Sequence, residues 1–591
     1  METQLNLDSL TVDKTGRVSF SGLGSGIDIQ GTVDAIIEAK RLPIDSIEQR
    51  ISERDTQIAA LQTLRSLALG LRDAVAGLRG AVSYDKSGDV FAAKQAFATS
   101  RRADTDPPSS AADLLGVTVT NQAQATSHTV EIQQIATAHK VASGSQLGAL
   151  ADPLGLAGVF SINGASVTVA ASDSLLDLRD KINAVNTGSS PSGVTASLVS
   201  VSAGEHVLVL TADETGASHA MTLTDDSGTV LEDLGVLDGV GLIENQLQAA
   251  NSALLAVDGL ASPISRESNT IDDVFEGVTL SLFKAEAGTT IDLAVERDLG
   301  QVKGAITDFV DAYNAIRIEI NALAQTEVPA DDDSGAGVLA GTSVLSEARA
   351  RLAAAVGAAV ESDTASLAVL AEIGITFKPA SEVADPLAAN SLVIDEAELD
   401  EALLNQTEAV RSLFNFQLAS SDPAVRLAGF DGQTGYLPGG HTLNIAYAGG
   451  SITSANLGGS PDGADDGTVT VNGTVLTVTA GPAKGLKLLY SGEAAVSGVD
   501  LDVGVGIGAK VFHAVDGLLD ETSGLFANEI EARAGQNDFA AERVTKMEAR
   551  LERERERLLE RFVQMETALT TMNRLLDSLR QQFDAAFNSN R

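Results

Sequence analysis

The chain has 591 residues, with 81 acidic and 40 basic side chains and a formal net charge of −41. So acidic a surface repels phosphate groups, which disfavours nucleic acid as a partner. The absence of cysteine excludes thiol catalysis and cysteine-ligated metal centres. The length predicts several domains rather than one core.

Residues 1–43 are predicted to form a flexible, Gly-rich N-terminal segment followed by a short helix. Val33, Ile36 and Ile37 would line the apolar face of this helix, and Pro43 would stop or kink it. A separate, longer helix is then expected over 44–80.

This N-terminal stalk helix carries apolar residues at spacings of three and four: Ile44, Ile47, Ile51, Ile58 and Leu61, with Arg54 in one slot. Leu64 and Leu71 continue the pattern after a one-residue shift. Such spacing is typical of a coiled-coil seam.

Residues 81–298 are predicted to form β-rich head domains, because apolar residues alternate there with polar ones, as in Val167/Val169 and Ile291/Leu293/Val295. Asn163-Gly164 and Asp258-Gly259 are expected to make tight hairpin turns, which need positive φ at both residues. One helix, from Ser174 to Ile182, is embedded among the strands.

Helical spacing returns over 299–421, predicted to be a helical leg domain with helices at 299–325, 343–360 and 395–415 and a linker at 329–337. Residues 422–510 are Gly-rich and strand-like, which indicates an inserted β module with a turn at Asn472-Gly473. Residues 511–591 are assigned to a C-terminal helical stalk with a coiled coil over about 537–587.

The C-terminal helix has an unbroken alternation of four and three between apolar residues: Leu558, Phe562, Met565, Leu569, Met572, Leu576, Leu579 and Phe583. We call these eight the distal seam, and Ile44, Ile47, Ile51, Ile58 and Leu61 the proximal seam. The predicted fold is therefore α+β and multidomain, with long terminal helices that form a coiled-coil stalk and antiparallel β domains inserted between them. Such a stripe can be an intramolecular core, but its place at the chain ends favours a docking surface for a partner.

Nothing in the sequence predicts an enzyme, a metal site or a cofactor. The six histidines do not form a metal-binding motif, and Gly22–Gly26 is not followed by the lysine of a phosphate-binding loop. The Asp-rich runs at 331–333 and 462–466 do not have the spacing of a calcium loop. The sequence also shows no cleaved secretion signal and no membrane-spanning stretch, which fits a cytoplasmic protein or export by a dedicated machine.

Several segments resemble flagellar hook-associated protein 2, the bacterial filament-cap family, in the expected order. The first is FSGLGSGIDIQGTVDAIIEAKRLPIDSI within 20–75, and the second is AVDGLASPISRESNTIDDVFEGVTLSLF within 256–298, followed by ITDFVDAYNAI at 306–316. LAEIGITF at 370–377, SLVIDEAELDEALL within 391–414 and the C-terminal helix complete the set. Residues 161–200 are similar to a repeat of hook-associated proteins and flagellins. The chain differs from the family in about 18 extra N-terminal residues, in the lack of an expected Asp within 338–352 and in its large 422–510 module.

The resemblance implies a homo-oligomeric ring at the distal tip of the flagellum, outside the cell, that helps exported flagellin to fold and insert. The implied partners are other copies of the chain, flagellin, the hook–filament junction protein and a cytoplasmic export chaperone. It also implies type III export without a cleaved signal peptide. Two alternatives remain at this point: another axial flagellar protein, such as a junction protein or flagellin variant, and a secreted adhesin that binds glycans or mediates cell adhesion through its β modules.

Overall fold

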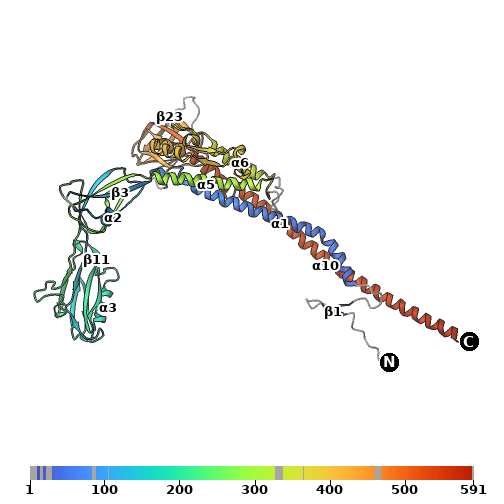
Figure 1. Cartoon of the computed structure of the whole chain (residues 1–591), viewed down its shortest axis with the longest axis horizontal. Helices are drawn as coiled ribbons and strands as arrows, with labels where there is room; N and C mark the ends of the chain where they lie inside the picture. The colour runs from blue at the N-terminus through green and yellow to red at the C-terminus, as the bar shows by residue number, and fades with distance from the viewer. Residues whose placement is uncertain are drawn as a thin grey trace.

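The computed structural model describes residues 10–12, 18–20, 29–80, 82, 88–103, 106–325, 337–363, 365–458 and 468–588. The molecule is elongated and bent: a helical region with a β module lies at its centre, two β domains extend to one side and a two-helix stalk extends to the other (Figure 1). This arrangement confirms the predicted α+β multidomain fold with long terminal helices and inserted antiparallel sheets.

The stalk consists of α1 (Ile29–Ala76) and α10 (Leu525–Asn588), which run antiparallel and pack along much of α1. The predicted division into a short helix and a second helix from residue 44 is wrong, because α1 passes through Pro43 without a break. Ion pairs join α1 to α10 before this proline, at Asp34–Arg555 and Arg41–Glu548, and Ile44 and Ile47 after it are buried in the same interface. We infer that these contacts offset the cost of the missing hydrogen bond at Pro43.

Most of the segment predicted to be flexible lies outside the described residues. Within it, the structure gives two short strands, β1 (Leu10–Val12) and β2 (Val18–Phe20), which pair antiparallel. The predicted linker at 329–337 also lies outside the described residues, except for Gly337.

The central core packs α1 against five further helices: α5 (Leu299–Leu323), α6 (Ser343–Gly357), α7 (Glu396–Asn405), α8 (Thr407–Phe414) and α9 (Ile507–Leu519). A small sheet of β19 (Ile375–Phe377) and β20 (Leu392–Ile394) lies beside them. The helix predicted over 395–415 is two helices separated at Gln406. Apolar residues of α5 recur at helical spacing, and Val302, Ile306, Phe309, Val310, Tyr313 and Ile316 are all buried, as the pattern predicts.

The β domain nearest the helices has two antiparallel sheets around one core. One sheet follows the order β15 (Ile264–Arg266), β14 (Ala253–Val257), β5 (Ser127–Gln134), β18 (Thr289–Arg297) and β3 (Lys94–Arg102). The other follows the order β16 (Thr270–Phe275), β17 (Val278–Leu282) and β4 (Leu115–Val119). The short α2 (Ala111–Leu114) precedes β4. The alternating residues Ile291, Leu293 and Val295 all point into this core.

The second β domain lies at the far end of the molecule and has a core of its own (Figure 1). One sheet contains β10 (Val194–Ser202), β11 (Glu205–Thr215), β6 (Ala138–Ala142), β13 (Gln246–Gln248) and β7 (Gln146–Leu147). The other has β12 (Leu223–Ser227), β8 (Gly158–Ile162) and β9 (Ala165–Val169), with α4 (Val230–Asp233) after β12. The predicted helix is α3 (Leu175–Val185), which begins with a capping box between Ser174 and Asp177. Asn163 and Gly164, at φ 51° and 85°, form the predicted turn between β8 and β9.

The inserted β module has two four-stranded sheets and begins at Phe416, earlier than the predicted residue 422. One sheet follows the order β21 (Phe416–Ser420), β28 (Val496–Val505), β23 (Leu437–Ala448) and β24 (Ser451–Gly458). The other follows the order β22 (Val425–Gly429), β27 (Lys487–Tyr490), β26 (Val475–Val478) and β25 (Val469–Asn472). Asn472 pairs with Val475, so the loop between them is Gly473-Thr474. Of these two loop residues, Gly473 has positive φ and Thr474 does not, which fits a type II′ turn rather than the predicted turn on Asn472-Gly473.

Asp520 organises the turn that joins α9 to α10. Its carboxylate accepts hydrogen bonds from the backbone N–H groups of Ser523 (2.7 Å) and Thr522 (3.0 Å), and from both hydroxyls at 2.9 Å. These donors, the Ser523 N–H first, lower the pKa of Asp520 to about 2.

The stabilisation of this turn is therefore expected to depend on pH. The folded pKa of Asp520 is below its ordinary value of 3.8. The ionised group thus stabilises the fold above about pH 4, and this contribution is lost as the pH falls towards 2. Carbon-detected NMR titration of the Asp520 carboxyl group should give a midpoint near the lower value, and a midpoint at 3.8 would contradict the described hydrogen bonds.

Candidate assembly surface

The proximal seam lies within the molecule. Ile44 and Ile47 of α1 are buried against Val544 of α10, and the half-buried Ile51 packs beside them with Met547. These three seam residues therefore have an intramolecular partner, and the structure does not present them as a free docking surface.

The remaining two residues of the proximal seam lie where the stalk meets the central core. Leu61 is fully buried in that core, and Ile58 is half-buried. The face of α1 that contacts α10 near the stalk tip thus continues into the face that contacts α5 and α9.

A polar cluster sits between these two apolar parts of the stalk. Asn537 of α10 is 8% exposed; its Nδ2 donates to Asp55 Oδ1 at 2.7 Å, and its Oδ1 accepts from Arg54 Nη1 at 3.3 Å. A buried polar group in a helical seam favours the one register in which it is hydrogen-bonded. The arginine that interrupts the seam therefore has a function in pairing, and its partner Asn537 was missed because single-sequence spacing does not show which residues face each other.

The register of the stalk leaves the end of α10 without a helical partner from α1. Arg41 pairs with Glu548, and Asp34 pairs with Arg555 at 3.0 Å. Continued antiparallel pairing places Ile29, the first residue of α1, opposite about residue 560 of α10. The rest of α10 projects beyond the pair as a single helix of about 40 Å (Figure 1).

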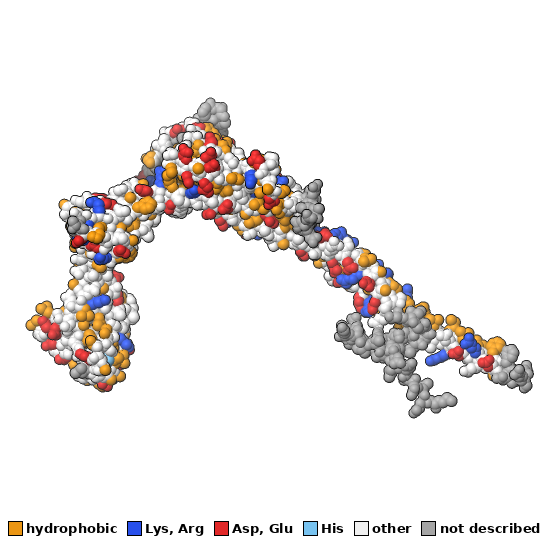
Figure 2. All heavy atoms as spheres, in the orientation of Figure 1, with side chains coloured by type: hydrophobic (Ala, Val, Ile, Leu, Met, Phe, Trp, Pro, Cys, Tyr) orange, Lys and Arg blue, Asp and Glu red, His pale blue; other side chains and the backbone are white. Residues whose placement is uncertain are grey.

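This projecting helix carries the distal seam, with Leu558 at its base. Leu558, Phe562 and Leu569 are half-buried, whereas Leu576 is 51% exposed and Phe583 is 65% exposed. Met565, Met572 and Leu579 are also exposed, and Leu575 beside them is 61% exposed. Figure 2 shows apolar side chains along this free end.

An exposed stripe of large apolar side chains at coiled-coil spacing is suited to packing against another helix. The structure thus separates the two seams: the proximal seam is internal, and the distal seam is the candidate assembly surface. The distal seam lies at the end of the molecule opposite the β domains (Figure 1).

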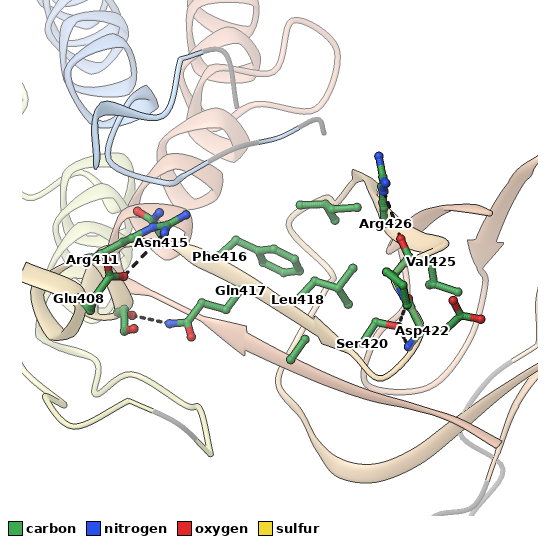
Figure 3. A pocket seen from close by; sticks show the side chains of 14 residues that line it. Glu408, Arg411, Asn415, Phe416, Gln417, Leu418, Ser420, Asp422, Val425 and Arg426 are labelled. Carbon is green, nitrogen blue, oxygen red and sulfur yellow. Dashed lines mark hydrogen bonds and ion pairs between the residues drawn. The ribbon is translucent and has the colours of Figure 1, made fainter. Parts of the chain in front are cut away.

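A polar hollow beside α8 and β21 is a different kind of site (Figure 3). Two charged groups on its rim, Arg411 and Glu408, form ion pairs between elements. Arg411 pairs with the buried Asp89 at 3.3 Å, and Glu408 pairs with Arg297 at 2.5 Å. These pairs join the helical core to the neighbouring β domain, so we assign the rim a structural role.

Among the described residues, no group of histidine and acidic side chains is arranged to hold a metal ion. In the same part of the chain, no helix is both long and apolar enough to cross a membrane. The Gly-rich run at 22–26 and the Asp-rich runs at 331–333 and 462–466 lie outside the described residues.

Comparison with known proteins finds three family matches. The family described as flagellar hook-associated protein 2 C-terminus matches residues 250–574, and its N-terminal counterpart matches residues 25–139. The flagellin hook IN motif matches residues 159–214, where the sequence predicted a repeat of this type.

The A-type flagellar hook-associated protein 2 of Pseudomonas aeruginosa is 27% identical over 419 residues, covering 67% of this chain and 80% of that protein. The Escherichia coli K12 flagellar hook-associated protein 2 is 28% identical over 409 residues, with the same coverage of 67% and 80%. The crystal structure of the D1-D2-D3 domains of the Escherichia coli flagellar cap protein FliD is 24% identical, covers 60% of this chain and 90% of that one, and has a TM-score of 0.45.

Proposed function

This chain belongs to the flagellar hook-associated protein 2 family, and we propose that it caps the distal tip of the flagellar filament, where it promotes folding and insertion of exported flagellin. The structural observation that carries this proposal is the distal seam, an exposed coiled-coil stripe on a single helix at the end of a long stalk.

The shape of the molecule supports different roles for its parts in the cap (Figure 1). The β domains within 81–298 would form the plate of the cap, in contact with other copies of the chain. The helical region within 299–421 and the two terminal helices would form a leg that reaches down to the filament. The inserted module within 422–510 would face outwards from the leg. Antiparallel pairing of α1 with α10 would stiffen such a leg.

The distal seam would exchange partners in the course of assembly. Before export, a cytoplasmic flagellar chaperone would cover its leucine, methionine and phenylalanine side chains, which would otherwise promote aggregation. After export through the flagellar apparatus without a cleaved signal peptide, the same stripe would pack against helices of flagellin or of the hook–filament junction protein. A homo-oligomeric ring at the extracellular tip would hold several such legs around the filament.

Replacing Leu569 and Leu576 together with aspartate is the test of this function. The two charges would prevent the seam from packing against another helix, whereas the monomer should stay folded because the half-buried Leu569 and the 51% exposed Leu576 both lie beyond the part of α10 that pairs with α1. Cells with this variant are expected to secrete monomeric flagellin into the medium and to have few or no filaments, measured by immunoblotting of the culture medium and by electron microscopy.

The matched control is Thr571→Asp with Ser578→Asp, which puts the same two charges seven residues apart on exposed positions outside the seam. This control should assemble normal filaments, and both proteins should unfold at the temperature of the wild type. Normal filaments in the seam variant would refute the proposal. Immunogold labelling along the shaft rather than at the tip would instead favour another axial flagellar protein.

A further inference from the structure

An open cavity of about 440 Å³ lies at the surface of the helical core, away from both seams. Tyr313 and Arg317 of α5 form one wall, and Ser346 and Arg349 of α6 form another. Phe377 of β19, Asn390, Ala350 and Ala353 complete the lining. It is open to solvent, because Ser346 and both alanines are exposed, while Tyr313 and Arg317 form its buried floor.

Arg317 is buried, with 5% of its surface exposed. Its Nε donates a long hydrogen bond of 3.4 Å to the backbone oxygen of Ala389. Among the described residues, no carboxylate forms an ion pair with Arg317, although the chain has twice as many acidic as basic side chains. An arginine that is this deeply buried is ordinarily paired with an anion.

The neighbouring groups make an uncompensated positive charge on Arg317 less favourable. Burial is the main cause that lowers the pKa of Arg317, and the positive charge of Arg349 lowers it further. The buried Nε of Arg349 has no hydrogen-bond partner among the described residues, and neither has the hydroxyl group of the fully buried Tyr313. Burial raises the pKa of Tyr313, so its phenol remains protonated and can donate.

The cavity therefore combines two guanidinium groups and two hydroxyl groups with an apolar wall. Guanidinium groups are donors only and match a carboxylate in two parallel hydrogen bonds. Phe377 stands edge-on to Tyr313 at 6.3 Å, and the two alanines extend the apolar surface. A fully hydrated inorganic anion would gain nothing from this wall, whereas an organic acid would contact both parts.

We propose that this cavity is a binding site for a carboxylate carried on an apolar or aromatic group, with Arg317 and Arg349 as its anion ligands. The carboxylate would neutralise the two like charges, and Tyr313 and Ser346 would donate to its remaining lone pairs. Two sources share this chemistry: a free small organic acid, and an acidic side chain next to an apolar residue on a second copy of this chain.

The test uses the full-length protein and 3-phenylpropionate as the probe, followed by isothermal titration calorimetry at constant ionic strength. Wild-type protein should bind the probe, and Arg349→Gln should bind it at least tenfold more weakly. The matched control is Arg351→Gln on the same helix, which removes an exposed arginine paired with Glu347 at 2.7 Å and should bind like the wild type. The neutral analogue 3-phenylpropionamide should bind at least tenfold more weakly than the acid.

Equal binding by the wild type and Arg349→Gln, or equal binding of acid and amide, would overturn the proposal. The melting temperature distinguishes loss of binding from loss of folding. Removal of one of two neighbouring like charges should leave the melting temperature of Arg349→Gln unchanged or higher. Sedimentation velocity distinguishes the two sources. If the probe dissociates wild-type oligomers and Arg349→Gln is less oligomeric, a second copy supplies the carboxylate; if binding occurs with unchanged oligomers, the natural ligand is a free organic acid.

Discussion

Replacing Phe414 with alanine is expected to lower the free energy of unfolding of the helical core by about 3–5 kcal/mol. Phe414, the last residue of α8, is fully buried. Its ring stacks on Phe91 at 6.2 Å and meets Phe309 of α5 edge-on at 6.3 Å. Phe91 belongs to the short turn before β3, so this one ring joins α8, α5 and the start of the first β domain.

The effect should be large because the residues around Phe414 cannot move into the space that its ring would leave. The backbone of α9 already approaches the end of α8 so closely that a Cβ on Gly508 would lie 2.8 Å from the Phe414 carbonyl oxygen. Urea unfolding of this variant, followed by circular dichroism, should show a first transition at a lower urea concentration than in the wild type. Phe539→Ala is the matched control, because Phe539 is 71% exposed on α10 and its loss should change stability by less than about 1 kcal/mol. Equal effects of the two substitutions would contradict the described packing.

The periodicity of apolar residues was sufficient to predict the main elements. Spacings of three and four identified α5, with its buried Ile306, Phe309 and Tyr313, and alternation identified β18. Both patterns depend only on which side of a local element faces the core, so they can be read from one stretch of sequence.

Features set by distant parts of the chain could not be predicted in this way. Pro43 predicted the end of a helix, but α10 contacts α1 through ion pairs before it and through Ile44 and Ile47 after it, and the helix continues. Asn537 has no distinctive spacing, and its role depends on Arg54 and Asp55 lying opposite. The cavity at Arg317 requires α5, α6 and β19 to meet, and no local pattern indicates that meeting.

The two seams also show that local sequence patterns cannot predict features set by distant parts of the chain. In the sequence, Ile44 and Leu576 are equivalent members of coiled-coil stripes. In the structure, Ile44 is fully buried and Leu576 is 51% exposed, because α10 extends beyond the start of α1. The point at which α10 extends beyond α1 depends on the register of the pair and on the lengths of both helices. Periodicity alone therefore predicted that the stripes pack, but not which one packs within the molecule.

Replacing Ile44 with aspartate is expected to open the outer stalk. Ile44 belongs to a small cluster in which only Ile47 and Val544 are also buried, so little else holds α1 to α10 there. Placing an unpaired carboxylate in this cluster should cost about 3–5 kcal/mol, which exceeds what the exposed ion pairs of the stalk contribute. Hydrogen exchange of residues 29–50 and 541–560 should become much faster, while the central core should keep its protection.

Leu42→Asp is the matched control, because Leu42 is 67% exposed on the same helix and, two residues from Ile44, lies on the opposite side of α1. Its stalk should exchange like the wild type. If Ile44→Asp left the exchange of both segments unchanged, the two helices would not be held by this cluster. If the stalk opens and filaments still form normally, then pairing of α1 with α10 is dispensable for the proposed leg. Loss of filaments in Ile44→Asp but not in Leu42→Asp would show that the distal seam must be presented on a paired stalk, since neither substitution alters the seam itself.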